Sequence, residues 1–217
     1  MGSGERRRRG IGESIDVLRM AGLLPQRAAP CIAPAAMASP LLFLDRPIVL
    51  VGLMGAGKST IGRRLGKRLG LPFVDADEEI ERAADRKVSE IFDSFGEPAF
   101  RDGERRVIAR LIEGGPQVIA TGGGAFMDER TRALILDRCT AIWLDADIET
   151  LTARVARRDT RPLLRGRDPR EAIAELAERR NPIYAQAHLR VRTEPVPHGE
   201  VVERIVAALA GRQRSAG

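Results

Sequence analysis

The stretch that most constrains the fold is residues 52–59, GLMGAGKS, which matches the pattern G-x-x-x-x-G-K-[ST] at every fixed position. Residues 47–51 ahead of it are apolar or β-branched without alternation, as in a parallel strand buried on both faces. Ile61, Leu65 and Leu69 follow at the spacing of a helix with one apolar face. The segment therefore predicts a strand, a phosphate-binding loop and a helix, in that order.

Such a loop binds nucleotide phosphates through its backbone. Glycines let successive N–H groups turn towards phosphate oxygens, and the helix that follows adds the positive end of its dipole. We expect Lys58 to reach the β and γ phosphates and the Ser59 hydroxyl to ligate Mg²⁺. A glycine-rich turn with a solvated lysine is the alternative, and the matching flanks disfavour it. The expected nucleotide-binding residues of the loop are Gly55, Ala56, Gly57, Lys58, Ser59 and Thr60.

Strand-like and helix-like segments alternate along the rest of the chain. The pattern predicts further strands at 71–75, 116–120, 141–144 and 189–192. It predicts helices at 77–86, 88–95, 98–112 and 201–209, with another beginning near Ile148. Alternating βα units imply an α/β fold, with a five-stranded parallel sheet and helices on both faces. Ligands on such a sheet bind beyond the carboxyl ends of its strands, so we expect polar residues that follow strands to share one edge. They are Lys58, Asp75, Asp77, Gly122 to Gly124, Asp145 and Asp147.

The charge of the chain is unevenly distributed. The net charge is +6, and residues 1–36 carry six arginines against three acidic residues, which accounts for half of it. Residues 1–40 are rich in Gly, Ala, Pro and Arg, so we predict a disordered arm ahead of one domain at 41–213. Met37 could alternatively be the natural start of the chain. An aromatic content of 4% argues against a nucleic-acid binder.

Cysteine usage and apolar runs indicate where the protein works. Cys31 and Cys139 are far apart and lack the spacing of a metal site, as in a reduced compartment. The sequence contains no run of eighteen apolar residues, so it predicts no membrane span. The amino-terminal residues lack the pattern of a secretory or transit signal. We therefore expect a cytoplasmic protein that acts on a small molecule as a monomer.

Two acidic residues follow the second predicted strand. Asp75 and Asp77 could divide the work, one near Mg²⁺ and the other accepting a hydrogen bond from an attacking hydroxyl. Asp77 could instead cap the following helix. The glycines at 122–124 could form a flexible turn, or they could let a small substrate lie against bare backbone amides. Spacing alone does not choose between these alternatives.

Arginines supply the remaining candidates. Arg101 lies between apolar neighbours on a predicted helix, and Arg180 precedes Asn181. Residues 154–170 concentrate arginine among few large apolar residues, as in a lid that closes over phosphate. Each of these arginines could also be an ordinary solvated surface residue.

The ordered set of motifs is more specific than its parts. From about Pro47 to Leu209 the chain closely resembles the shikimate kinases, and residues 1–40 lie outside the resemblance. The resemblance implies a P-loop three-layer sandwich of the nucleoside monophosphate kinase type with a small lid. It also implies transfer of the γ-phosphoryl group of ATP to the 3-hydroxyl of shikimate, with Mg²⁺ as cofactor, on the way to aromatic amino acids. The motifs are GLMGAGKST, FVDADEEIE, GEPAFRDGE, TGGGAF, TRPLL and RRNPIY.

The resemblance also implies roles for individual residues. Asp77 would bind the shikimate hydroxyls and serve as base, and Asp75 would hold Mg²⁺ through water beside Ser59. Arg101 and Arg180 would bind the substrate carboxylate. Gly122, Gly123 and Gly124 would contact the ring hydroxyls, and Arg161 would be the lid cation. The adenine ring would lie between Pro197 and one lid arginine, either Arg154 or Arg157.

Rival functions stay open on the sequence alone. Gluconate also carries a carboxylate, so another small-molecule kinase of the same shape is one rival, as is a nucleotide kinase. A P-loop ATPase is a second rival, with residues 141–145 as its Walker B strand. No hydrolytic glutamate follows Asp145, which could cap the next helix, as could Asp147. A GTPase is disfavoured because the chain has no Asn-Lys-x-Asp motif.

Overall fold

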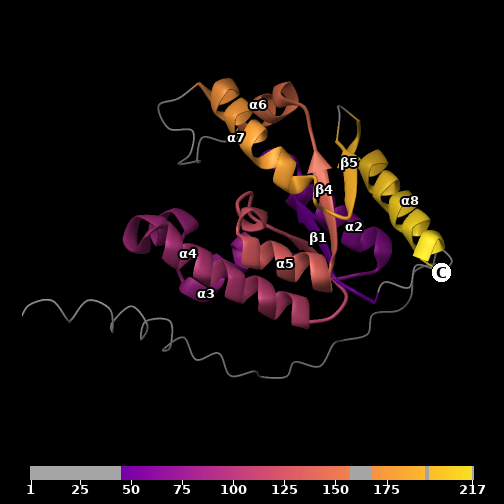
Figure 1. The fold of residues 1–217 in the computed structure, drawn as a ribbon, viewed down its shortest axis with the longest axis horizontal. Coiled ribbons are helices and arrows are strands. Elements are labelled where there is room, and N and C mark those ends of the chain that lie inside the picture. The colour runs from indigo at the N-terminus through magenta and orange to yellow at the C-terminus, as the bar shows by residue number, and fades with distance from the viewer. Residues whose placement is uncertain (1–44, 157–167, 194–195, 217) are drawn as a thin grey trace, which may run out of the picture.

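The computed structural model describes residues 45–156, 168–193 and 196–216. These residues form a five-stranded sheet in the order β2-β3-β1-β4-β5, in which every neighbouring pair is parallel (Figure 1). The expected α/β fold is therefore confirmed. The strands are β1 (Ile48–Val51), β2 (Phe73–Asp75), β3 (Val118–Ala120), β4 (Thr140–Asp145) and β5 (Leu189–Arg192).

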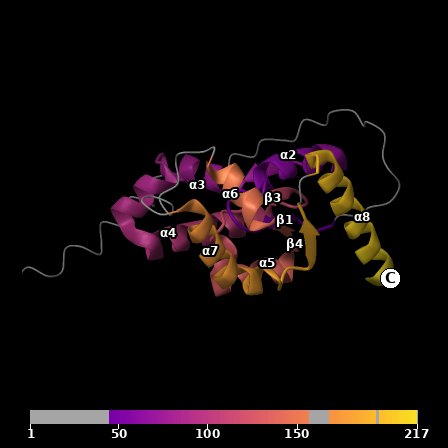
Figure 2. The same cartoon turned by 90° about the horizontal axis from the view of Figure 1, so that it is seen from above.

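Helices cover both faces of the sheet. Figure 2 shows α2 and α5 on opposite sides of it, and α8 packs beside α2. The helices are α2 (Lys58–Leu69), α3 (Ala76–Ala84), α4 (Val88–Glu113), α5 (Glu129–Arg138), α6 (Ile148–Ala156), α7 (Pro169–Tyr184) and α8 (His198–Ala216), with a short 3-10 helix η1 (Ala125–Met127).

The core lies between these layers and explains the apolar runs of the sequence. All four residues of β1 are fully buried, since β3 and β4 flank the strand and helices lie on both of its faces. Within α2, Ile61 and Leu65 are buried as well. Strand β1 and the apolar face of α2 thus pack in the same core. This packing fixes the ends of the phosphate loop that connects them.

Several predicted boundaries are wrong in detail. Helix α3 starts at Ala76 rather than at the predicted Asp77, because Asp75 is its N-cap. The helices predicted at 88–95 and 98–112 are both present within α4, and the break between them is confirmed at Gly96, whose φ of 75° and ψ of 171° are not helical. Helix α8 extends beyond the predicted 201–209 at both ends.

The predicted arm and lid fall largely outside the described residues. That holds for the arm at 1–40, with Met37 and Cys31, and for 157–167 with Arg157 and Arg161. The ends of the predicted lid are helical: Arg154 belongs to α6, and Pro169 opens α7 behind its cap, Asp168.

Candidate active site

The phosphate-loop sequence connects β1 to α2, as predicted. Gly57 is the N-cap of α2 with φ at 92°, a left-handed conformation that glycine adopts without strain. The first turn of α2 contains no acidic side chain, so the positive end of the helix stays available to an anion. Lys58 Nζ donates hydrogen bonds to the carbonyl oxygens of Gly52 at 2.8 Å and Leu53 at 2.9 Å, which holds the ammonium over the loop.

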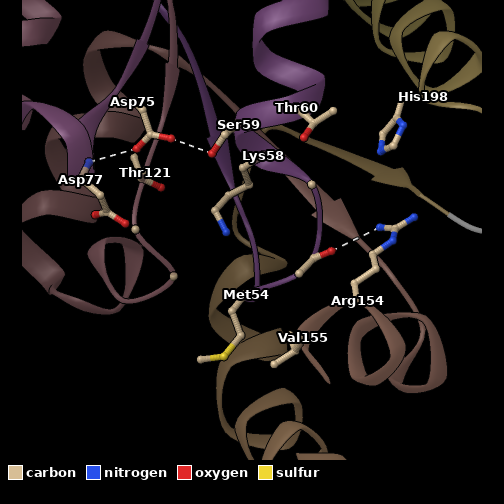
Figure 3. A pocket seen from close by; sticks show the side chains of 14 residues that line it. Met54, Lys58, Ser59, Thr60, Asp75, Asp77, Thr121, Arg154, Val155 and His198 are labelled. Carbon is tan, nitrogen blue, oxygen red and sulfur yellow. Dashed lines mark hydrogen bonds between the residues drawn. The ribbon is translucent and has the colours of Figure 1, made fainter. Parts of the chain in front are cut away.

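A hydrogen bond joins the phosphate loop to β2. The Ser59 hydroxyl donates to Asp75 Oδ2 at 2.6 Å, and Asp75 Oδ1 accepts from the backbone N–H of Asp77 at 3.1 Å (Figure 3). Asp75 is therefore the capping residue of α3, and the alternative that Asp77 caps this helix is wrong. Asp77 stands in the first turn of α3 with its side chain on the wall of a cavity.

That cavity, of about 440 Å³, lies at the carboxyl ends of β1, β2 and β3 (Figure 3). It brings together most of the predicted nucleotide, metal and acceptor residues. Those on its wall are Gly55, Gly57, Lys58, Ser59, Thr60, Asp75, Asp77, Gly122, Gly123 and Arg154. Ala56, Gly124, Arg101, Arg180 and Pro197 are not among its lining residues, and Met54, Thr121, Val155 and His198 are additional ones.

The glycines at 122–124 link the cavity to the predicted acceptor residues. A methyl group on Gly122 would lie 2.7 Å from Asp77 Oδ1, and one on Gly124 would lie 2.7 Å from Arg101 Nη1. Gly123 faces the phosphate loop, because a methyl group on it would be 3.6 Å from the Met54 nitrogen and 3.7 Å from Arg180 Nη1. A residue larger than glycine at 122 or 124 would therefore crowd Asp77 or Arg101, whereas at 123 it would make ordinary contacts. The loop at 122–124 thus lies between the phosphate loop and the predicted acceptor residues Asp77, Arg101 and Arg180.

Arg101 and Arg180 approach the loop at 122–124 from two different helices. Arg180, on α7, donates a hydrogen bond from Nη1 to the Gly123 carbonyl at 3.0 Å. Arg101, on α4, donates from Nη1 to Glu104 Oε2 at 2.6 Å and from Nη2 to Glu97 Oε1 at 3.1 Å. Neither arginine is an ordinary solvated surface residue: 23% of the Arg101 side chain is exposed, and Arg180 is half-buried.

Glu104 and Tyr184 are two residues of this region that the sequence analysis did not single out. Glu104 is buried, and burial raises its pKa above the ordinary range, opposed by the charge and hydrogen bond of Arg101. Tyr184 is buried against Phe126 and donates a hydrogen bond to the Gly123 carbonyl. Their spacing could have found them, because Glu104 follows Arg101 by three residues and Tyr184 follows Arg180 by four on the same helices.

The other end of the cavity lies between α6 and the start of α8. Arg154 Nη1 donates to the Gly55 carbonyl at 3.2 Å, so this guanidinium belongs to the wall of the phosphate loop. His198 faces it across the cavity (Figure 3). Burial, followed by the positive charges of Arg64 and Arg154, lowers the pKa of His198, which favours the neutral imidazole. Pro197 is exposed and does not line the cavity, and no sequence signal marked its neighbour His198.

Asp145 is the last residue of β4 and Asp147 follows the strand, but neither lines the cavity. Asp147 accepts a hydrogen bond from the Thr150 N–H at 2.6 Å and so caps α6. Asp145 pairs with Arg190 at 2.7 Å. The ATPase alternative, in which residues 141–145 form a Walker B strand, is not supported, because neither aspartate lies on the cavity wall.

Two further expectations concern the protein as a whole. Cys139 is buried, and burial raises its pKa to about 12, so its thiol is a packing group rather than a nucleophile. Among the described residues, no helix has the length and apolar character needed to cross a membrane.

Comparison with known proteins places this site in a family. The family model for shikimate kinase matches residues 54–210, from the phosphate loop into α8. The chain belongs to the shikimate kinase family. A shikimate kinase from Caulobacter vibrioides is 59% identical over 164 residues, covering 76% of this chain and 82% of the relative.

Solved structures agree with this membership. A shikimate kinase from Acinetobacter baumannii, determined in complex with shikimate, aligns with a TM-score of 0.74 at 34% identity over 77% of this chain and 94% of its own. A gluconokinase from Sinorhizobium meliloti aligns with a TM-score of 0.55 at 18% identity over 80% of this chain and 96% of its own. The second similarity shows a common fold and nothing about the acceptor.

Proposed function

We propose that the protein transfers the γ-phosphoryl group of ATP to the 3-hydroxyl of shikimate, giving shikimate 3-phosphate and ADP. Besides family membership, one observation carries this proposal. The loop at 122–124 touches Asp77, Arg101 and Arg180, and it also faces the phosphate loop at Met54. A hydroxylated acid bound on this loop would therefore lie beside the terminal phosphate of a nucleotide, as direct transfer requires.

On the nucleotide side, the chain supplies positive charge and N–H donors where the phosphates would lie. Lys58 would exchange its two carbonyl partners for β and γ phosphate oxygens, and the N-terminus of α2 would bind the same anion. Arg154 and His198 face each other at the far end of the cavity, where we place the adenine ring. We therefore propose His198, rather than Pro197, as the residue opposite Arg154 at the adenine ring.

Mg²⁺ is the cofactor that this site fits. The Ser59 hydroxyl and the Asp75 carboxylate meet at 2.6 Å, and both present the oxygen donors that Mg²⁺ prefers. One or two protein ligands suffice, because water and phosphate oxygens complete the octahedron. When bound, Mg²⁺ would neutralise charge on the β and γ phosphates.

On the acceptor side, Asp77 is the candidate base. Its carboxylate reaches the surface of Gly122, where it could orient the attacking hydroxyl and take its proton. Arg101 and Arg180 approach the same loop from α4 and α7, so their guanidinium groups could bind the substrate carboxylate from two sides. A neutral analogue would leave both cations unpaired, which would make the site select an acid.

The remaining assignments are proposals of the same kind. Arg161, outside the described residues, stays our candidate for the cation that reaches the transferring phosphate. We further propose that the enzyme works in the cytoplasm as a monomer, on small molecules rather than on nucleic acid or membranes. In support of a single-chain site, one chain supplies both the nucleotide side and the acceptor side of the cavity. Light scattering that returned twice the mass of one chain would reject the monomer.

The product tests the proposal. Phosphorus NMR of a reaction containing ATP, Mg²⁺ and shikimate should show ADP and one phosphate monoester, shikimate 3-phosphate, forming in equal amounts. Inorganic phosphate in place of the ester would show that water, rather than shikimate, is the acceptor.

A further inference from the structure

The carbonyl oxygen of Gly123 accepts two hydrogen bonds from side chains of α7. Arg180 Nη1 donates at 3.0 Å, and the Tyr184 hydroxyl donates at 2.5 Å. Residues four apart on a helix share a face, so α7 aims both donors at one atom. A carbonyl oxygen has two lone pairs, and here both are used.

The two donors differ in how firmly they are held. Tyr184 is 1% exposed, and its ring lies against Phe126 of η1 and Trp143 of β4, with centroid distances of 6.3 Å and 6.1 Å. Arg180 is only half-buried and ends in a guanidinium that can turn to another acceptor. Burial raises the pKa of Tyr184 to about 12, so its hydroxyl keeps the proton that it donates at neutral pH.

The proposed function asks Arg180 to change partners. Its guanidinium must meet the acceptor's carboxylate, and a charged partner competes well against a neutral backbone carbonyl. When Arg180 turns, the Gly123 carbonyl loses one of its two donors. Gly123 lies between Gly122 and Gly124, whose surfaces touch Asp77 and Arg101, so a tilt of this peptide would disturb the acceptor site.

We propose that Tyr184 is a positioning residue for the acceptor: its hydroxyl holds the Gly123 carbonyl in place while Arg180 turns to the substrate carboxylate. The proposal rests on the proposed function, and it adds a residue that contacts no substrate. Tyr184 acts only through the loop at 122–124. Its loss therefore weakens acceptor binding and leaves the nucleotide end of the cavity, at Arg154 and His198, unchanged.

The test compares Tyr184→Phe with Gln117→Met. Phenylalanine keeps the packed ring and removes the donor. Gln117 is also buried and donates from its side chain to a backbone carbonyl, that of Leu111, but it lies at the opposite end of β3 from the loop. We expect Tyr184→Phe to raise the KM for shikimate about fivefold to tenfold, the usual worth of one hydrogen bond, with the KM for ATP within about twofold of wild type. Gln117→Met should lower Tm and change neither KM.

Calorimetric titration of shikimate without ATP separates this inference from the proposed function. Wild type that binds no shikimate would reject the proposed function itself. Wild type that binds, with Tyr184→Phe binding equally well, would overturn the role of Tyr184 alone. An equal rise in both KM values would overturn it too, because that pattern indicates a general loss of structure.

The variant Arg180→Ala tests the role of Tyr184 independently of whether Tyr184→Phe folds normally. If Tyr184 holds the loop by itself, Arg180→Ala should weaken shikimate binding and leave Tm close to wild type. A large fall in Tm in Arg180→Ala would make Arg180 the main tether of the loop and would contradict the proposal.

Discussion

Arg101 Nη1 and Glu104 Oε2 lie 2.6 Å apart, and only 2% of the Glu104 side chain is exposed. The pair sits one turn apart on α4, directly behind the loop at 122–124. Glu104 thereby holds a guanidinium that faces the acceptor, in a place where an unpaired carboxylate would be costly.

The pair has a consequence for the pH dependence of stability. Burial raises the pKa of Glu104 in the folded protein above its ordinary value of 4.5. The contribution of this group to the free energy of unfolding is therefore fully present below pH 4.5 and is lost as pH rises through the raised pKa. Glu104→Gln lacks this loss, so its stability relative to wild type should improve between pH 4.5 and pH 7. Urea denaturation at both pH values measures the change, and a relative decline of the variant would contradict it.

Lys58 is the residue on which phosphate binding depends. Lys58→Met should abolish turnover while the fold survives, because Lys58 Nζ donates to two carbonyls of the phosphate loop and is the group expected to reach the β and γ phosphates. Lys67→Met is the matched control, since Lys67 is exposed on the same helix, and it should keep wild-type activity. Steady-state rates with circular dichroism check both variants. Activity in Lys58→Met would reject the loop assignment.

Asp77 is expected to act in the chemical step rather than in capping. Asp77→Asn should lower kcat by roughly 10² or more, the scale of a positioned acid-base group, with little change in Tm. Glu78→Gln removes a neighbouring carboxylate that is exposed and paired with Arg63, so it serves as control. Stopped-flow or steady-state rates with thermal melts decide the matter. A variant that lost only stability would return Asp77 to a structural role.

His198 should matter to the nucleotide, whereas Pro197 should not. His198→Ala should raise the KM for ATP about tenfold, since stacking of one base on an aromatic side chain contributes on the order of 1–3 kcal/mol. Pro197→Ala should leave this KM unchanged, because Pro197 is exposed and off the cavity wall. The same assay with shikimate varied is the internal control. The reverse ranking of the two variants would restore the assignment made from the sequence.

Much of this site could be predicted because it depends on local sequence. Buried parallel strands read as continuous apolar runs, so residues 48–51 and their loop were visible without coordinates. The edge where ligands gather follows from strand direction alone, which brought Lys58, Asp77 and Gly122 together correctly.

What the sequence left open depends on contacts between distant segments. The choice of Asp75 over Asp77 as cap is a matter of one residue in a helix boundary, beyond the resolution of periodicity. The Tyr184–Gly123 bond joins residues 61 positions apart, and Arg154 faces His198 because the end of α6 and the start of α8 meet at the same cavity. Such residues are recognised by their burial and by their contacts with distant segments, and neither can be read from a single sequence.

The most direct measurement is the rate of ADP release from ATP and Mg²⁺ with four acceptor conditions: shikimate, gluconate, a nucleoside monophosphate and none. We predict rapid release with shikimate alone, lost in Lys58→Met and kept in Lys67→Met. Release that is as fast without acceptor, or faster with gluconate or the nucleotide, would contradict the account.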